Sequence, residues 1–140
     1  MRAIVLVAAA MLVIGCAHSS QPNANSGADL QAAKDESDLA EALANRTPEA
    51  PLDCVDQRDL SVHKSFGRGA ILFGNRKDTV VYLNRPPAGC PGLNVATTIE
   101  TKTPGTRLCR GDLVTVADPA SHVEYGSCAL GQFTPYRLSH

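Results

Sequence analysis

Residues 70 to 83 read AILFGNRKDTVVYL, and this stretch decides the fold class. Ala70 to Phe73 is a compact apolar run, and Thr79 to Leu83 is rich in the β-branched and aromatic residues that favour strands. Gly74 to Asp78, which lies between them, contains the glycine, asparagine and aspartate typical of turns. The stretch therefore predicts a β-hairpin.

Similar short apolar runs, separated by turn residues, continue on both sides of the hairpin. Leu60 to Phe66 alternates loosely before it, and Leu93 to Thr101 follows it with Val, Ile and several Thr residues. Past a turn at 103–106, we expect further strands within Arg107 to Ala117 and Val123 to Leu130. This spacing of strands and turns is typical of a small all-β domain.

Cysteine usage indicates how so small a domain is stabilised. Residues 51–140 contain no Trp and few aromatic residues, so the hydrophobic core must be small. They also contain four of the five cysteines, an even number that in an oxidising compartment predicts two disulfides. The fold class predicted for this block is therefore all-β, a disulfide-stapled antiparallel sheet or barrel-like domain. The four cysteines are Cys54, Cys90, Cys109 and Cys128.

Four cysteines permit three pairings. We favour Cys54 with Cys128, which would close the ends of the domain, and Cys90 with Cys109 inside it. None of the four belongs to a C-x-x-C pair, and no Cys or His pair has zinc-finger spacing. A redox or structural zinc site is therefore poorly supported.

The N-terminus has the layout of a secretion signal. Arg2 precedes an apolar run from Ala3 to Ile14, which is shorter than the roughly 20 residues that a membrane-spanning helix needs. The run ends in Val13-Ile14-Gly15-Cys16, which resembles the lipobox of bacterial lipoproteins. Residues 1–15 are thus predicted to be removed, leaving Cys16 as the lipidated first residue. Ordinary signal cleavage after Ala17 is the alternative.

Residues 16–50 are predicted to be an acidic, flexible tether. The segment at 17–28 is small and polar, whereas Asp29 to Asn45 contains helix formers and a thin apolar stripe. Thr47-Pro48 should stop the helix. A partly helical spacer is the favoured interpretation, and docking on the domain or on a partner is the alternative.

Charge excludes one class of partner. The formal net charge is −1 for the whole chain, with the acidic excess in the tether and a mildly basic β block. Nothing in this distribution suggests a nucleic-acid ligand. The membrane, reached through the lipid on Cys16, and an unidentified envelope protein or cell-wall component are the expected partners.

The sequence offers weak candidates for chemistry. His63 and His122, together with Asp112 or Asp118, are residue types that form metal sites or acid–base pairs, although no spacing joins them. Gly69 and Gly74 have the separation of the two phosphate-loop glycines, but the Lys-Ser/Thr pair that should follow is absent. No serine lies in a G-x-S-x-G elbow. We therefore expect no catalytic residue, no metal ligand and no cofactor.

Aromatic residues lie beside glycines in Phe66 to Gly69 and in Gly131 to Tyr136. Such pairs can form a platform for a sugar or a peptide. In small β domains, however, terminal aromatics more often pack into the core, and we favour packing here.

Three cysteine motifs resemble a family of small, exported proteobacterial domains of unknown function. They are Cys90-Pro91-Gly92-Leu93, Arg107-Leu108-Cys109-Arg110-Gly111-Asp112 and Cys128-Ala129-Leu130-Gly131-Gln132-Phe133-Thr134-Pro135. The family has a further upstream cysteine, matched here by Cys54. The resemblance supports the disulfide prediction and implies no activity.

The sequence therefore predicts a lipid-anchored periplasmic protein. Ala17 after the lipidated cysteine is similar to lipoproteins sorted to the outer membrane, where the domain would face the periplasm. A non-enzymatic binding or structural module is the leading functional hypothesis. The alternatives are a secreted inhibitor of an envelope enzyme and a small metal-dependent hydrolase that uses His63, His122 and Asp112.

Overall fold

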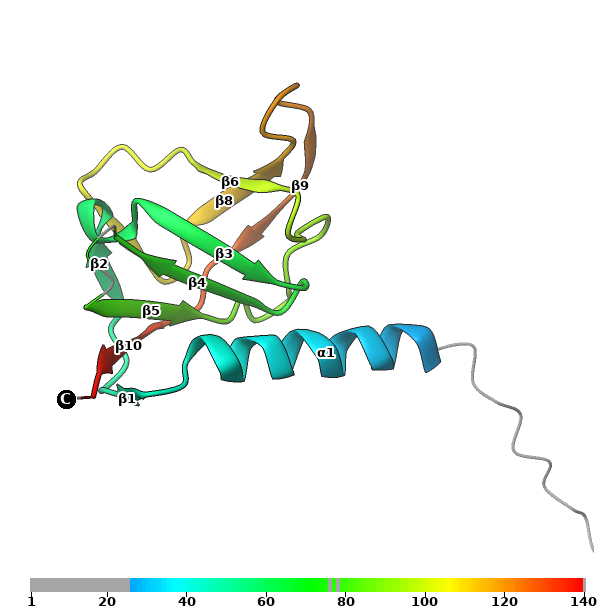
Figure 1. Ribbon diagram of the computed structural model, residues 1–140. Helices are drawn as coiled ribbons and strands as arrows, with labels where there is room; N and C mark the ends of the chain where they lie inside the picture. The colour runs from blue at the N-terminus through cyan, green and yellow to red at the C-terminus, as the bar shows by residue number, and fades with distance from the viewer. Residues whose placement is uncertain (1–25, 76, 78, 140) are drawn as a thin grey trace, which may run out of the picture.

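The computed structural model describes residues 26–75, 77 and 79–139, and it shows a mainly antiparallel β domain with one α-helix (Figure 1). Two disulfides staple the strands, as the sequence predicts. The elements in chain order are α1 (Ser26–Ala42), β1 (Arg46–Pro48), β2 (Cys54–Asp56), the 3-10 helix η1 (Gln57–Leu60), β3 (Val62–Phe66), β4 (Ala70–Gly74), β5 (Val80–Asn84), β6 (Thr98–Thr101), β7 (Arg107–Cys109), β8 (Leu113–Ala117), β9 (Glu124–Ala129) and β10 (Phe133–Leu138).

The strands form three antiparallel sheets. The largest has the order β1-β10-β5-β4-β3, the second pairs β2 with β7, and the third has the order β6-β8-β9. The expected hairpin is β4–β5, with Leu72 opposite Leu83. The run expected at 107–117 divides into β7 and β8, because a turn lies between them and each strand joins a different sheet.

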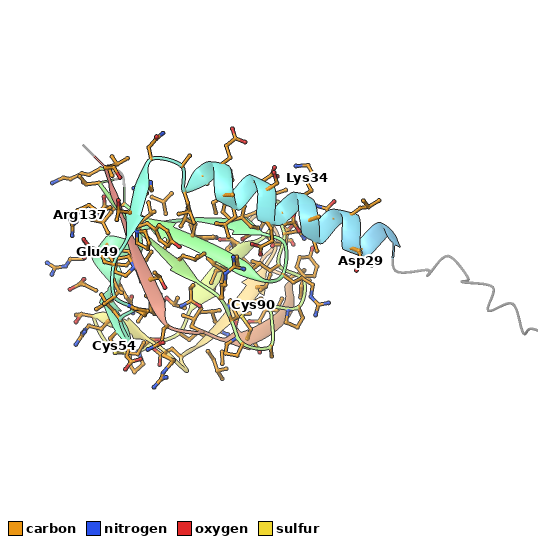
Figure 2. All side chains as sticks on the ribbon, turned by 90° about the horizontal axis from the view of Figure 1, so that it is seen from below. Asp29, Lys34, Glu49, Cys54, Cys90 and Arg137 are labelled. Atoms are coloured by element: carbon orange, nitrogen blue, oxygen red, sulfur yellow. A yellow bond between two sulfur atoms is a disulfide. The ribbon has the colours of Figure 1, made fainter. Side chains whose placement is uncertain are left out.

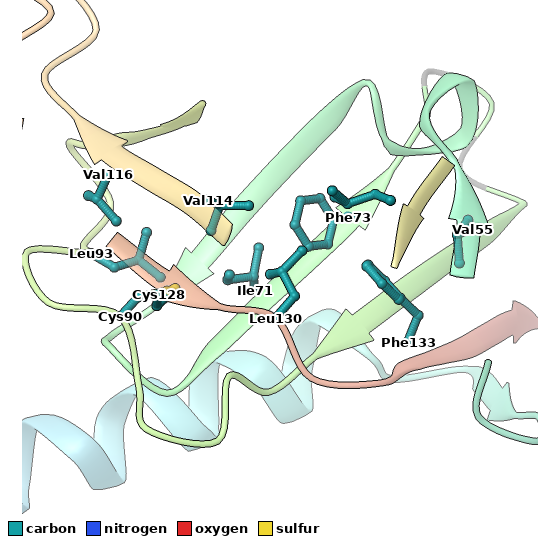
Figure 3. Packing of buried hydrophobic residues seen from close by; sticks show 11 residues of the cluster. Val55, Ile71, Phe73, Cys90, Leu93, Val114, Val116, Cys128, Leu130 and Phe133 are labelled. Carbon is teal, nitrogen blue, oxygen red and sulfur yellow. A yellow bond between two sulfur atoms is a disulfide. The ribbon is translucent and has the colours of Figure 1, made fainter. Parts of the chain in front are cut away.

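The main core fills the space between the three sheets (Figure 3). Alternate residues of β4 point into it, so Ile71 and Phe73 are buried there while Ala70 and Leu72 lie on the opposite face of the sheet. Phe133 at the start of β10 is fully buried, and its ring lies 5.9 Å from that of Phe73. Phe66 is likewise buried, on the other face of the sheet, so both phenylalanines for which packing was favoured do pack.

A buried amide controls how the chain passes from one sheet to another. Asn84 is 0% exposed; its side-chain nitrogen donates to the Gly131 carbonyl at 2.8 Å, and its oxygen accepts from the Gly131 amide at 2.9 Å. Gly131 lies between β9 of the three-stranded sheet and β10 of the five-stranded sheet. A Cβ at this position would collide with the Arg85 carbonyl oxygen, so the close approach requires glycine.

The pairing that we favoured for the cysteines is wrong. Cys54 pairs with Cys109, which lies directly opposite it in the β2–β7 ladder, with a Cα–Cα distance of 4.0 Å. Cys90 pairs with Cys128 in the core, with a Cα–Cα distance of 5.0 Å. Strand pairing, not a disulfide, joins the two ends of the β domain, because β1 pairs with β10 and Leu52 bridges to Phe133.

The sheet begins before residue 51, where the sequence analysis placed the start of the domain. After α1, Asn45 adopts a left-handed conformation (φ 62°) and the chain turns into β1. Its carbonyl accepts a hydrogen bond from the Ser139 amide at 2.9 Å. In Figure 2 this edge is marked by Glu49 and Arg137, whose side chains form an ion pair at 2.7 Å.

Replacing Asn84 with alanine should strongly destabilise the domain. The change leaves both backbone groups of Gly131 buried without their partner, which costs about 1–3 kcal/mol for each group. Chemical denaturation should therefore show a loss of roughly 2–5 kcal/mol in the free energy of unfolding. Asn94→Ala is the control, because Asn94 is exposed and bonds only within its own loop. Equal losses in the two variants would contradict this role of Asn84.

Each disulfide should contribute about 4 kcal/mol to stability by the loop-entropy model, because the loops span 55 and 38 residues. Replacing both members of either pair with serine should therefore lower the midpoint of thermal unfolding markedly. Peptide mapping without reduction checks the pairing itself. Recovery of peptides that link Cys54 to Cys128 would contradict the structure.

Candidate functional site

Helix α1 covers the outer face of the five-stranded sheet (Figures 1 and 2). Leu39 is 2% exposed and packs with Phe66, Ala70 and Leu83, whereas Leu30 near the start of the helix is 72% exposed. The favoured interpretation of this segment as a spacer did not anticipate the contact. The helix also begins at Ser26, three residues before the expected start and within the segment expected to be flexible.

An ion pair holds α1 against the connection that follows β5. The two terminal guanidinium nitrogens of Arg85 donate to the Glu36 carboxylate, at 2.7 and 2.8 Å. The hydrogen bonds from Arg85 hold the pKa of Glu36 below its usual range. The helix also lies very close to the turn between β3 and β4. A Cβ on Gly67 in this turn, where φ is 55°, would collide with the Asp35 carboxylate of the helix. Glycine at 67 therefore permits both the turn and the docked helix.

A groove of about 530 Å³ opens between the N-terminal half of α1, the β3–β4 turn and the loop at 93–95. Ala28 and Ala32 form its helical wall, and Phe66, Leu93 and Val95 complete a largely apolar lining. Val95 is 85% exposed, so the groove has an apolar side chain at its rim. Its polar lining residues are Gln31, Asp35, Glu36, Arg68 and Asn94.

The histidines and the aspartate considered for metal or acid–base chemistry are not brought into one site. His63 lies on β3 against Phe73, with ring centroids 6.3 Å apart. His122 contacts Glu100 through Nδ1 at 3.1 Å. Asp112 accepts a hydrogen bond from the Cys109 amide at 2.8 Å. Within the described part of the chain, no hydrogen bond or ion pair joins any two of the three.

The aspartates serve local structure instead. Asp112 closes the turn between β7 and β8, since its carboxylate accepts from Cys109. Asp118 caps the next turn by accepting from the amides of Ala120 and Ser121, at 2.9 and 2.7 Å. These hydrogen bonds hold the pKa of Asp118 below its usual value. Both side chains are thus engaged in shaping turns.

Cys16, the predicted lipidation site, lies outside the described residues. Among the residues that the structure does describe, no three His, Cys, Asp or Glu side chains are grouped so that they could hold a metal ion. Nor does this part of the chain contain a helix long and apolar enough to cross a membrane.

Comparisons of the chain with protein-family models, with curated proteins and with solved structures find no match. The resemblance of the cysteine motifs to exported domains of unknown function therefore stays a prediction.

Sequence reasoning missed the groove because its walls come from three separate segments. One local signal was present: Gly67-Arg68-Gly69 places two residues without side chains beside Phe66, where another element can approach closely. A second signal was the narrow apolar stripe of the helical segment, which is sufficient to dock it on a sheet. The stripe consists of Leu39, Ala42 and Leu43.

Leu39→Ala should release α1 from the sheet. Truncation of a buried leucine costs about 2–5 kcal/mol, and this side chain joins the helix to the apolar residues beneath it. Hydrogen exchange of the α1 amides should become much faster while that of β4 and β5 changes little. Leu30→Ala, an identical change at an exposed position of the same helix, should leave both unchanged. Continued protection of α1 in the Leu39 variant would contradict the docking.

Proposed function

We propose that the protein is a lipid-anchored binding module of the bacterial cell envelope, which holds a segment of a partner protein in the groove beside α1. The observation that carries this proposal is the groove itself, an apolar hollow of about 530 Å³ on the surface of a small domain. Concave sites with an apolar lining and a few polar groups are where proteins bind their ligands. A partner segment with a large apolar side chain would fill it.

The position of the groove fits the proposed anchor. Ala28 and Ala32 lie near the N-terminal end of α1, which begins ten residues after Cys16 in the sequence. Ten residues span at most about 35 Å, so a domain held by a lipid on Cys16 would carry the groove close to the membrane. An envelope protein bound there would be retained at the same surface. Ala17 favours the outer membrane, with the domain in the periplasm.

The two disulfides support an oxidising compartment. A non-enzymatic role is proposed because the groove offers an apolar surface with a few polar groups at its margin, and because His122 and Asp112, two of the three candidate catalytic residues, form hydrogen bonds elsewhere in the domain. The polar residues of the margin would orient a bound segment. Inhibition of an envelope enzyme remains an alternative use of the same surface.

Site-specific crosslinking in cells tests the binding role. A photoreactive side chain at position 32 lies in the groove, whereas one at position 33 is on the same helix but does not line it. Position 32 should give a discrete crosslinked product that position 33 does not. Filling the groove with Val95→Arg should abolish that product, because it places a charge at the apolar rim. Equal crosslinking at 32 and 33 would contradict the proposal.

The anchor is tested separately by the intact mass of the protein purified from membranes. A diacylglyceryl or triacyl adduct on Cys16 is the expected result. A species that begins at His18, without lipid, would refute the anchor while leaving the groove to be judged by crosslinking.

A further inference from the structure

The two disulfides lie in different surroundings. Cys90 is 0% exposed and Cys128 is 7% exposed, and both belong to the main core (Figure 3). Cys54 and Cys109 are only half-buried, and neither belongs to a core cluster. A thiol in solution therefore reaches the Cys54–Cys109 bond more readily, because core side chains enclose the other one.

The alternation of side chains along β2 and β7 decides which face of this two-stranded sheet carries the disulfide. Val55 and Leu108 lie directly opposite each other and point into the core, where they are 4% and 1% exposed. Their neighbours Cys54 and Cys109 therefore point to the other face, which also carries the exposed side chain of Arg107. The disulfide thus lies on the solvent side of the sheet.

Backbone pairing holds the two cysteines together without the help of the disulfide. On one side of them, the Arg110 amide donates to the Asp53 carbonyl at 2.6 Å. On the other side, the Gln57 amide donates to the Thr106 carbonyl at 2.8 Å. Hydrogen-bonded and non-hydrogen-bonded pairs alternate in an antiparallel ladder, so the cysteines form a non-hydrogen-bonded pair, in which side chains approach most closely. The two thiols would therefore stay side by side after reduction.

The charged side chains that contact β2 and β7 balance one another. Two carboxylates form ion pairs with arginines, at 3.3 and 2.9 Å, and one further cation and one further anion bond to the backbone of the cysteines. An approaching thiolate thus meets no net charge, and access should govern its reaction. The ion pairs are Asp53–Arg110 and Asp56–Arg58, and the further groups are Arg107 and Asp112.

We propose that Cys54–Cys109 is a thiol–disulfide exchange site, which a dithiol protein of the C-x-x-C class reduces while Cys90–Cys128 stays intact. One thiolate of the dithiol attacks a sulfur of the bond, forms a mixed disulfide and releases the other cysteine as a thiolate. The second thiolate of the dithiol then attacks the mixed disulfide and releases the remaining cysteine. Two electrons and two protons pass to Cys54 and Cys109, and the dithiol becomes a disulfide.

The exchange leaves the rest of the domain in place. The five-stranded sheet and the core bond Cys90–Cys128 do not depend on the β2–β7 disulfide. Neither β2 nor β7 lines the groove beside α1, so the exchange site can fail or succeed without the function proposed above.

Timed reduction of the oxidised, folded full chain with dithiothreitol tests the proposal. Samples are quenched in acid, their free thiols are alkylated, and the labelled peptides are identified by mass spectrometry. A species alkylated at Cys54 and Cys109 alone should accumulate, because the core bond should be reduced at least about tenfold more slowly. Equal rates for the two bonds, or earlier loss of Cys90–Cys128, would overturn the proposal.

The same reaction in concentrated guanidinium chloride is the control. Unfolding removes the difference in burial, so both bonds should then be reduced at similar rates. An equally strong preference for Cys54–Cys109 in the unfolded chain would show that the local sequence causes it, and would overturn the assignment to the fold.

A thioredoxin-like protein whose second C-x-x-C cysteine is replaced by serine tests the class of reductant. It cannot resolve the mixed disulfide, so it should give a covalent complex that is linked at Cys54 or Cys109. Cys54→Ser combined with Cys109→Ser should abolish this complex, whereas Cys90→Ser combined with Cys128→Ser should retain it. Absence of a complex with the unchanged protein, or linkage at Cys90 or Cys128, would overturn the proposal. The timed reduction needs no variant, so it decides the matter even where a double variant fails to fold.

Discussion

The structure depends on one buried amide group. Asn84 and Gly131 exchange two hydrogen bonds at the point where the chain leaves the three-stranded sheet and enters the five-stranded sheet. Because a buried amide must be satisfied, this pairing fixes the crossing in one place. Phe133, two residues further on, is thereby placed in the core, and β10 is set between β5 and β1. The contact therefore helps to place β10 beside β5 in the largest sheet.

The two disulfides act on different parts of this framework. Cys54–Cys109 ties together the small sheet of β2 and β7, which has only three residues in each strand. Cys90–Cys128 holds the long connection between β5 and β6 against β9. A domain of this size buries too little apolar surface to hold such a connection by packing alone. The cross-links therefore secure a short strand pair and a connection that lies outside the sheets.

Local patterns were sufficient to predict the central strands and insufficient for the outer ones. The β4–β5 hairpin was predicted because its strands and turn are contiguous, and β3, β6, β8 and β9 were located for the same reason. In contrast, β1 and β10 contain Pro48 and Pro135, and both depend on distant partners. β1 pairs only with β10, about 90 residues away, and β10 also pairs with β5, about 50 residues away. The Pro135 carbonyl accepts a hydrogen bond from the Glu49 amide, on the side of β10 that faces away from β5. The backbone N and C=O of one strand residue point to the same side, so the N–H that proline lacks would not have bonded to β5. The disulfide pairing, the docking of α1 and the groove beside it likewise join distant segments that a single sequence does not connect.

The five-stranded sheet has a different environment on each of its two faces. On the outer face Phe66 meets α1 and lines the groove, whereas on the inner face His63 contacts Phe73 of the main core. Since side chains alternate along β3, one short strand contributes to both faces. A partner held beside α1 would lie at the end of the domain that leads to Cys16.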